Sequence, residues 1–106
     1  HYCVPAHTAI AHASKVSSEV TEALRNRAPL PGERLEALRT FTLSLVRRRG
    51  AVDEASPESF LRAGFTTRHV LETLLGLAQK TISNFTNHLA QTPIDAEFER
   101  FALHEA

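Results

Sequence analysis

The sequence lacks the features by which several large protein classes are recognised. Lysine plus arginine and aspartate plus glutamate each number 12 in 106 residues, so the formal net charge is zero. A balanced charge gives no general attraction to nucleic acid or to an anionic membrane. The only basic run, Arg47–Arg49, falls at the end of a predicted helix, where cations stabilise the negative end of the helix dipole. We therefore expect neither nucleic acid nor a membrane as a partner.

Long apolar runs, methionine and all but one cysteine are also missing. No stretch approaches the roughly 20 apolar residues that a membrane-spanning helix needs, and the first residues do not follow a signal-peptide pattern. A single cysteine excludes an internal disulfide framework and favours a reducing compartment, the cytoplasm. Because the chain has no methionine and opens inside what reads as structured sequence, we expect it to be a piece of a longer protein.

Helical periodicity dominates what is present, and no strand signal of useful length interrupts it. The pattern predicts helices over residues 3–14, 18–27, 33–49, 57–64, 67–91 and about 95–103. The predicted N-caps are side chains that accept a hydrogen bond from the first turn: Ser17 or Ser18, Ser56, Thr66 and Asp95. With short connections, this indicates an all-α fold, a compact bundle of about six helices in one domain, residues 1–106.

The longest predicted helix carries an apolar stripe that continues for about six turns. Its members are Val70, Leu71, Leu74, Leu75, Ala78, Ile82, Phe85 and Leu89. A domain of this size buries only about two thirds of its unfolded surface. It cannot hide every apolar helix face, and we expect a homo-oligomer.

Cys3 and His7 are the residues most suited to chemistry. They are four apart at a predicted helix start, so they share one face. Pro5 supports this placement because proline is tolerated in the first turn of a helix and resisted further in. The helix dipole favours a thiolate at Cys3, and His7 can accept the thiol proton directly or through water. The spacing alone also fits an inert buried cysteine beside a surface histidine.

A family resemblance supports the reactive interpretation. The opening Tyr2–Ala9 reads YCVPAHTA, and residues 80–89 read KTISNFTNHL, followed by TPID at 92–95. Together with residues 46–50 and 60–66, these segments resemble the AhpD-like family and its carboxymuconolactone decarboxylase relatives. The similarity extends in order over nearly the whole chain.

The resemblance implies a thiol-dependent peroxidase or disulfide reductase. Cys3 would attack a hydroperoxide or form a mixed disulfide, and His7 would be the base or a proton relay. The implied partners are a peroxide or disulfide substrate, an external dithiol electron donor and further copies of the chain in a trimer or hexamer. No cofactor, flavin, haem or metal is implied.

The family motif is usually Cys-x-x-Cys-x-x-x-His, with a glutamate further upstream. Cys3 matches the second cysteine and His7 the histidine, so the first cysteine would lie directly before residue 1. A complete protein with that cysteine would hold a redox dithiol. If residue 1 is the mature start, a one-cysteine site remains.

Other residues fit the site less specifically. Lys80, Asn84 and His88 are spaced by four and form a polar line on the long helix, with Asn87 nearby. This line is typical of a solvated face or of contacts between subunits; a sharper hypothesis puts Asn84 or His88 beside Cys3. Tyr2 reads as a packing residue that lines the site.

Two further interpretations of the chain stay open. A lyase of the carboxymuconolactone decarboxylase type would need a general acid or base and a cationic anchor for carboxylates, and it would not need a redox thiol. A non-catalytic helical assembly module would use Cys3 only for structure. The histidines give no convincing zinc spacing, and no G-x-S-x-G motif points to serine chemistry.

Overall fold

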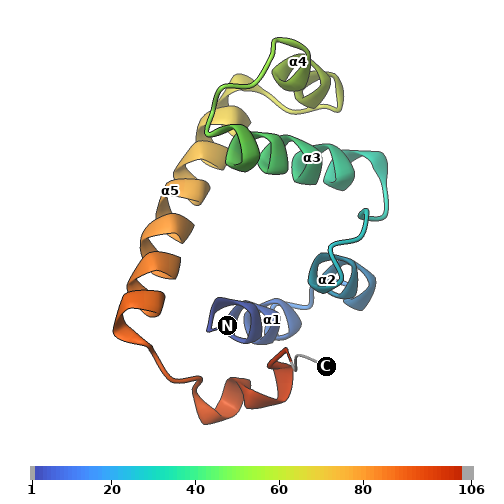
Figure 1. Ribbon diagram of the computed structural model, residues 1–106. Helices are drawn as coiled ribbons and strands as arrows, with labels where there is room; N and C mark the ends of the chain where they lie inside the picture. Colours follow the sequence, from blue (N-terminus) through green and yellow to red (C-terminus); the bar gives the residue numbers. More distant parts are fainter. Residues whose placement is uncertain (1, 104–106) are drawn as a thin grey trace. The chain divides into compact units, whose positions relative to one another are not determined.

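The computed structural model describes residues 2–103, and its regular secondary structure in that range is entirely helical (Figure 1). The helices are α1 (Cys3–Ala13), α2 (Ser18–Arg25), α3 (Glu33–Arg48), α4 (Ala55–Arg62), α5 (Thr67–Ala90) and the 3₁₀ helix η1 (Ala96–Phe101). The all-α prediction is thus confirmed for these residues, and so is the expected number of about six helices.

Contacts between residues divide the chain into two compact units. The first contains α1, α2, η1 and the part of α5 from Lys80 onward, and the second spans residues 29–79. The single domain predicted for residues 1–106 stays a prediction. The site-bearing residues all belong to the first unit.

The start of α5 shows why this helix was predictable. The hydroxyl oxygen of Thr66 accepts a hydrogen bond from the His69 N–H at 3.4 Å, and His69 Nδ1 accepts one from the Thr66 N–H at 2.9 Å. The two residues therefore satisfy each other's backbone donors, as in a capping box. The predicted cap at Thr66 is confirmed, and α5 runs for 24 residues.

Three predicted caps are wrong. Ser17 holds the N-cap position of α2 and Ser18 is the first residue of that helix, but the Ser17 side chain makes no capping bond. Helix α4 begins at Ala55, one residue before Ser56, and the carboxylate of Asp53 accepts the Ser56 N–H at 3.2 Å. Asp95 holds the N-cap position of η1, but its side chain makes no capping bond. It accepts a hydrogen bond from the Tyr2 hydroxyl at 2.7 Å instead. The last helix is also a 3₁₀ helix that ends at Phe101, so Leu103 lies outside it.

The second unit has a core of stacked aromatic rings. Phe60, only 1% exposed, lies between Phe41 and Phe65, with ring centroids 4.4 Å and 4.2 Å away. Leu45 completes the buried cluster. Five half-buried apolar side chains pack against the cluster: Leu38, Val52, Phe65, Val70 and Leu77. This packing holds α3 and α4 against the first turns of α5.

The first unit has less buried apolar surface and depends more on polar links. Pro5, Ala6 and Thr8 form the buried side of α1. Arg25 of α2 donates from Nη1 to the Thr8 hydroxyl at 3.0 Å and to the Phe101 carbonyl at 2.8 Å. One guanidinium therefore ties α2 to α1 and to the end of η1. This clamp fixes the helix that carries Cys3.

Candidate functional site

Cys3 is the first residue of α1. Its thiol is free and half-buried. Pro5 follows in the first turn and is fully buried, which anchors this end of the helix against its neighbours. The backbone N–H groups of a first helical turn have no acceptor within the helix, and they favour negative charge beside them. The sulfur thus lies at the positive end of the helix dipole.

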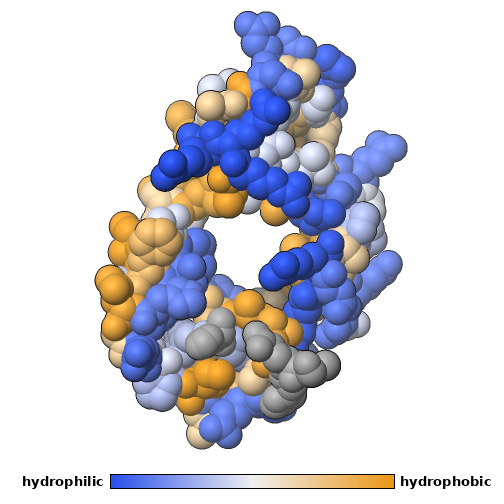
Figure 2. Space-filling model, viewed as in Figure 1, coloured by the Kyte–Doolittle hydropathy of each residue, from blue (hydrophilic) through white to orange (hydrophobic). Residues whose placement is uncertain are grey.

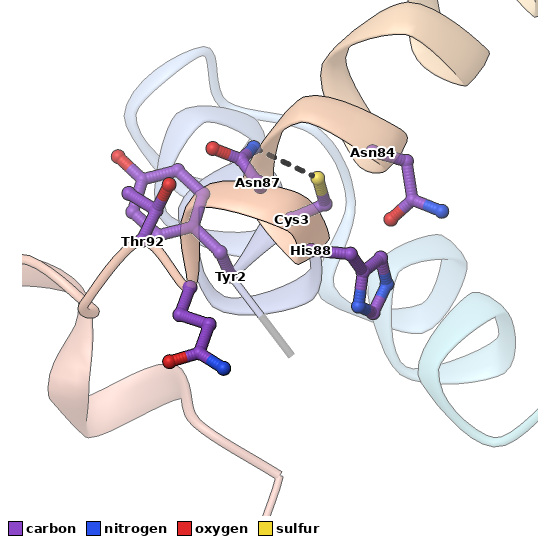
Figure 3. Close-up of a pocket in the computed structure, with 7 residues that line it drawn as sticks. Tyr2, Cys3, Asn84, Asn87, His88 and Thr92 are labelled. Atoms are coloured by element: carbon purple, nitrogen blue, oxygen red, sulfur yellow. Dashed lines mark hydrogen bonds between the residues drawn. The ribbon is translucent and has the colours of Figure 1, made fainter.

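The side-chain amide of Asn87 contacts that sulfur. Asn87 Nδ2 donates to Cys3 Sγ at 3.6 Å (Figure 3). Both side chains are half-buried. An amide N–H is a donor that a thiolate accepts more strongly than a neutral thiol does, because hydrogen bonds to a charged acceptor are the stronger ones. The contact therefore places a hydrogen-bond donor beside the sulfur.

His7 lies one turn beyond Cys3, but both of its ring nitrogens have partners other than the sulfur. Nδ1 is 2.9 Å from the carbonyl oxygen of Cys3, and Nε2 is 2.6 Å from Nζ of Lys80. A carbonyl only accepts and an ammonium only donates, so the proton of a neutral ring is on Nδ1 and the lone pair on Nε2 faces Lys80. Direct transfer of the thiol proton to His7 requires the ring to leave one of these partners.

Tyr2 lines the site without offering its proton to it. Its hydroxyl donates to Asp95, and this hydrogen bond, together with desolvation, raises the pKa of Tyr2 above its ordinary value of 10.0. The ring packs edge-on against Phe98, with centroids 6.4 Å apart. Tyr2 thus joins the start of α1 to η1 and stays protonated at neutral pH.

Two cavities meet at Cys3. One, of about 380 Å³, has polar walls from the last turns of α5 and the residues after it, including Asn84, Asn87 and His88 (Figure 3). Tyr2 and Cys3 close its other side. Of the two site-lining residues predicted on the long helix, both lie in this wall. The residue that reaches the sulfur is Asn87, which the sequence analysis did not select.

The second cavity, of about 370 Å³, is mainly apolar. Its walls include Val4, Val16, Leu24 and Leu103, and Cys3 borders it as well. Three cations also line it: Arg25, Arg27 and Lys80. Arg25 serves as the clamp described above, and Lys80 contacts His7. The side chain of Arg27 is exposed at this cavity. The thiol therefore borders a polar space and an apolar space.

A signal for Asn87 was present in the sequence. Lys80 and Asn87 are seven residues apart, which is two helical turns, so they point the same way. This face lies opposite the apolar stripe. From this face, Lys80 contacts His7, 73 positions earlier in the chain, and Asn87 contacts Cys3, 84 positions earlier.

Residues 2–103 contain no group of three or more histidine, cysteine, aspartate or glutamate side chains placed to hold a metal ion. Within the same range, every helix is too short or too polar to cross a membrane. No protein-family model matches the chain, and no curated protein matches it significantly. The resemblance to the AhpD-like family therefore stays a prediction.

Proposed function

We propose that the chain is a thiol-dependent oxidoreductase that reduces organic hydroperoxides through Cys3. The observation that carries the proposal is the environment of the sulfur. Sγ of Cys3 lies at the positive end of α1, accepts the Asn87 amide at 3.6 Å and borders two cavities. Reactive cysteines combine neighbours that favour a thiolate with access to a substrate; the helix start, the amide donor and the two cavities support the proposal on both counts.

The reaction would run in two stages. The thiolate of Cys3 attacks the terminal oxygen of the hydroperoxide, so an S–O bond forms while the O–O bond breaks. The alkoxide leaves, takes a proton and becomes an alcohol, and Cys3 becomes a sulfenic acid. An external dithiol then attacks this sulfur and releases water, forming a mixed disulfide. Its second thiol displaces Cys3, so the donor leaves as a disulfide.

His7 and Lys80 would manage the protons of the first stage. Both line the apolar cavity together with Cys3. We assign the thiol proton to His7, whose Nε2 accepts it after the ring turns away from Lys80. The ammonium of Lys80 then supplies the proton that the leaving alkoxide needs. These roles keep a cation beside the oxygen on which negative charge develops.

The size and lining of the second cavity indicate the substrate class. Ligand cavities range from about 300 to 1,000 Å³, so a volume of about 370 Å³ suits a small ligand. Apolar walls favour an alkyl or aryl group over a hydrogen of the peroxide. We therefore expect an organic hydroperoxide to react faster than hydrogen peroxide.

Peroxide consumption tests this proposal. The chain should consume cumene hydroperoxide with dithiothreitol as the electron donor, and Cys3→Ser should lose this activity almost completely. His12→Asn is a matched control, because His12 is an exposed histidine of the same helix, outside both cavities at Cys3. Helical circular dichroism checks that each variant is folded. An unchanged rate in Cys3→Ser would refute the proposal.

One observation favours the lyase alternative. His7 and Lys80, 2.6 Å apart, supply a base and a cation beside an apolar cavity that Arg27 also borders. Decarboxylation of a small lactone acid needs such groups and no thiol. Cys3→Ser separates the two chemistries, because a lyase would retain its turnover of a lactone carboxylate in this variant. The wild-type chain would then leave cumene hydroperoxide unreacted.

A further inference from the structure

The apolar cavity at Cys3 is lined by more positive charge than its own walls neutralise. Arg25, Arg27 and Lys80 border this cavity of about 370 Å³, and none of its wall residues within 2–103 is an aspartate or a glutamate. Figure 2 shows apolar and hydrophilic residues side by side where Figure 1 labels α1 and α2. Apolar walls with unneutralised cations are complementary to an anion that carries an apolar chain.

One of the three cations, Arg25, is already occupied by contacts within the chain. Its Nη1 donates to the Thr8 hydroxyl and to the Phe101 carbonyl. Its Nε lies 4.0 Å from a carboxylate oxygen of Glu22. These contacts use the guanidinium to hold α2 in place. The cation that a ligand could bind therefore has to come from another part of the wall.

The other two cations keep their charge unneutralised. Within residues 2–103, no carboxylate forms an ion pair with Lys80 or with Arg27. The contact of Lys80 is with a ring nitrogen of His7, which does not cancel the positive charge. The Arg27 side chain is exposed at the cavity. An arginine presents paired N–H donors that match the two oxygens of a carboxylate, so Arg27 is suited to bind one.

The backbone places Arg27 at the cavity without help from its side chain. Residue 27 follows α2 in the left-handed conformation, with φ 55. Its N–H donates to the Leu24 carbonyl at 3.2 Å, and the Ala28 N–H donates to the Ala23 carbonyl at 2.8 Å. Such a helix end is held by backbone hydrogen bonds. A substitution at position 27 can therefore change the charge at the cavity and keep this turn.

We propose that this cavity binds a small carboxylic acid with an apolar chain, and that Arg27 holds its carboxylate. The chain would cover Val16 and Leu24, wall residues that are 43% and 53% exposed. That the acid carries the hydroperoxide that Cys3 reduces rests on the proposed function. Arg27 then determines specificity, because it selects hydroperoxides of carboxylic acids over neutral ones.

Binding of octanoate tests the site, with octanamide as its neutral analogue. Both are titrated into the Cys3→Ser chain and followed by NMR of the Val16 and Leu24 methyl groups. Octanoate should shift these resonances and bind more tightly than octanamide. Arg27→Glu should weaken octanoate binding on the order of tenfold, because an attraction is replaced by a repulsion at an exposed position. The same variant should leave octanamide binding nearly unchanged.

Arg49→Glu is the matched control. Arg49 also follows a helix in the left-handed conformation, with φ 54, and it lies on α3, outside the cavity. The substitution changes the net charge equally, so octanoate should bind as it does to the parent chain. The proposal is overturned if octanoate leaves the Val16 and Leu24 methyl groups unshifted, if octanamide binds as tightly, or if the two arginine variants have equal affinity for octanoate.

Turnover separates this site from the proposed function. The wild-type chain should reduce a hydroperoxide of octanoic acid with a lower KM than the hydroperoxide of its methyl ester, and Arg27→Glu should abolish this preference. Equal KM values for acid and ester in the wild-type chain would overturn the role of Arg27. Turnover of neither hydroperoxide, with octanoate still bound, would refute the proposed function and support the carboxylate site alone.

Discussion

Replacing Asn87 by aspartate would put a carboxylate where the structure has the amide that donates to Cys3. The two side chains have nearly the same shape, so the change is mainly one of charge. Asn87 Nδ2 is 3.6 Å from Sγ. At that separation, two like charges repel by about 1 kcal/mol in a water-like dielectric and by about 4 to 5 kcal/mol at an effective dielectric of about 20. Both residues are half-buried, so we take about 1 to 2 kcal/mol, near the lower bound.

That repulsion lowers the ratio of thiolate to thiol by about five- to thirtyfold. The remaining thiolate is more basic and is therefore a stronger nucleophile. With a Brønsted slope of about 0.4 to 0.5, this gain cancels nearly half of the loss in the logarithm of the rate. The expected outcome is that iodoacetamide alkylates Cys3 about two- to sixfold more slowly in Asn87→Asp. Mass spectrometry of the single cysteine measures this rate directly.

Asn84→Asp provides the matched control. Asn84 lines the same cavity as Cys3 but is exposed. The same charge there is screened by solvent, so Cys3 should react at nearly the wild-type rate. The reasoning is refuted if Asn87→Asp also reacts at the wild-type rate, or if both aspartates slow alkylation equally.

Three other predictions concern stability and titration. Phe60→Ala should destabilise the second unit by about 3 to 5 kcal/mol, because this ring is 1% exposed; urea unfolding measures the loss, and a cost below about 1 kcal/mol would contradict the stacked core. The Leu30 N–H lowers the pKa of Glu36 below its ordinary 4.5, so its contribution to stability is full above that pH and is lost as pH falls through the folded value. Glu36→Gln should remove this acid dependence from urea unfolding; an unchanged acid profile would disprove the contact. The hydrogen bond to Asp95 raises the pKa of Tyr2, which is the only tyrosine in the chain. The ultraviolet titration of Tyr2 should therefore have a midpoint above 10.0, and Asp95→Asn should lower this midpoint. The stability that this bond contributes is lost as pH rises through the raised pKa.

The helices could be predicted because their causes are local. Periodicity found α5, and Thr66 marked its start because a threonine at that position caps the first turn. Ser56 was wrongly predicted as a cap because Ser56-Pro57 has the pattern of an N-cap serine followed by proline at the first helical position. Asp53, three residues earlier, supplies the carboxylate that accepts the Ser56 N–H. Two nearby candidates competed, and the sequence did not rank them.

The side-chain contacts at the site could not be predicted in the same way. Spacing placed Cys3 and His7 one turn apart, as the structure has them. The atoms that contact them belong to Lys80, 73 positions after His7, and to Asn87, 84 positions after Cys3. Likewise, Asp95 was expected to cap its own helix, but its carboxylate accepts a hydrogen bond from Tyr2, near the other end of the chain. Contacts between distant segments leave no periodic signal.

The hydrophobic pattern also could not predict which apolar residues of α5 are buried. Periodicity shows that α5 has an apolar face, but it does not show what covers that face. The structure assigns Val70 and Leu77 to the core of the second unit and leaves Ile82 and Leu89 exposed. Of the predicted stripe, Val70 therefore packs in the core, whereas Ile82 and Leu89 stay exposed.

The most direct test of the central claim is the oxidation of Cys3 by one equivalent of cumene hydroperoxide. Dimedone traps the sulfenic acid, and mass spectrometry counts the labelled chains as a function of time. The folded chain should be labelled several times faster than the same chain unfolded in urea, because only the folded chain holds the sulfur at the start of α1 beside the Asn87 amide. Equal or slower labelling of the folded chain would show that its fold does not activate the thiol, and the proposed oxidoreductase function would be wrong.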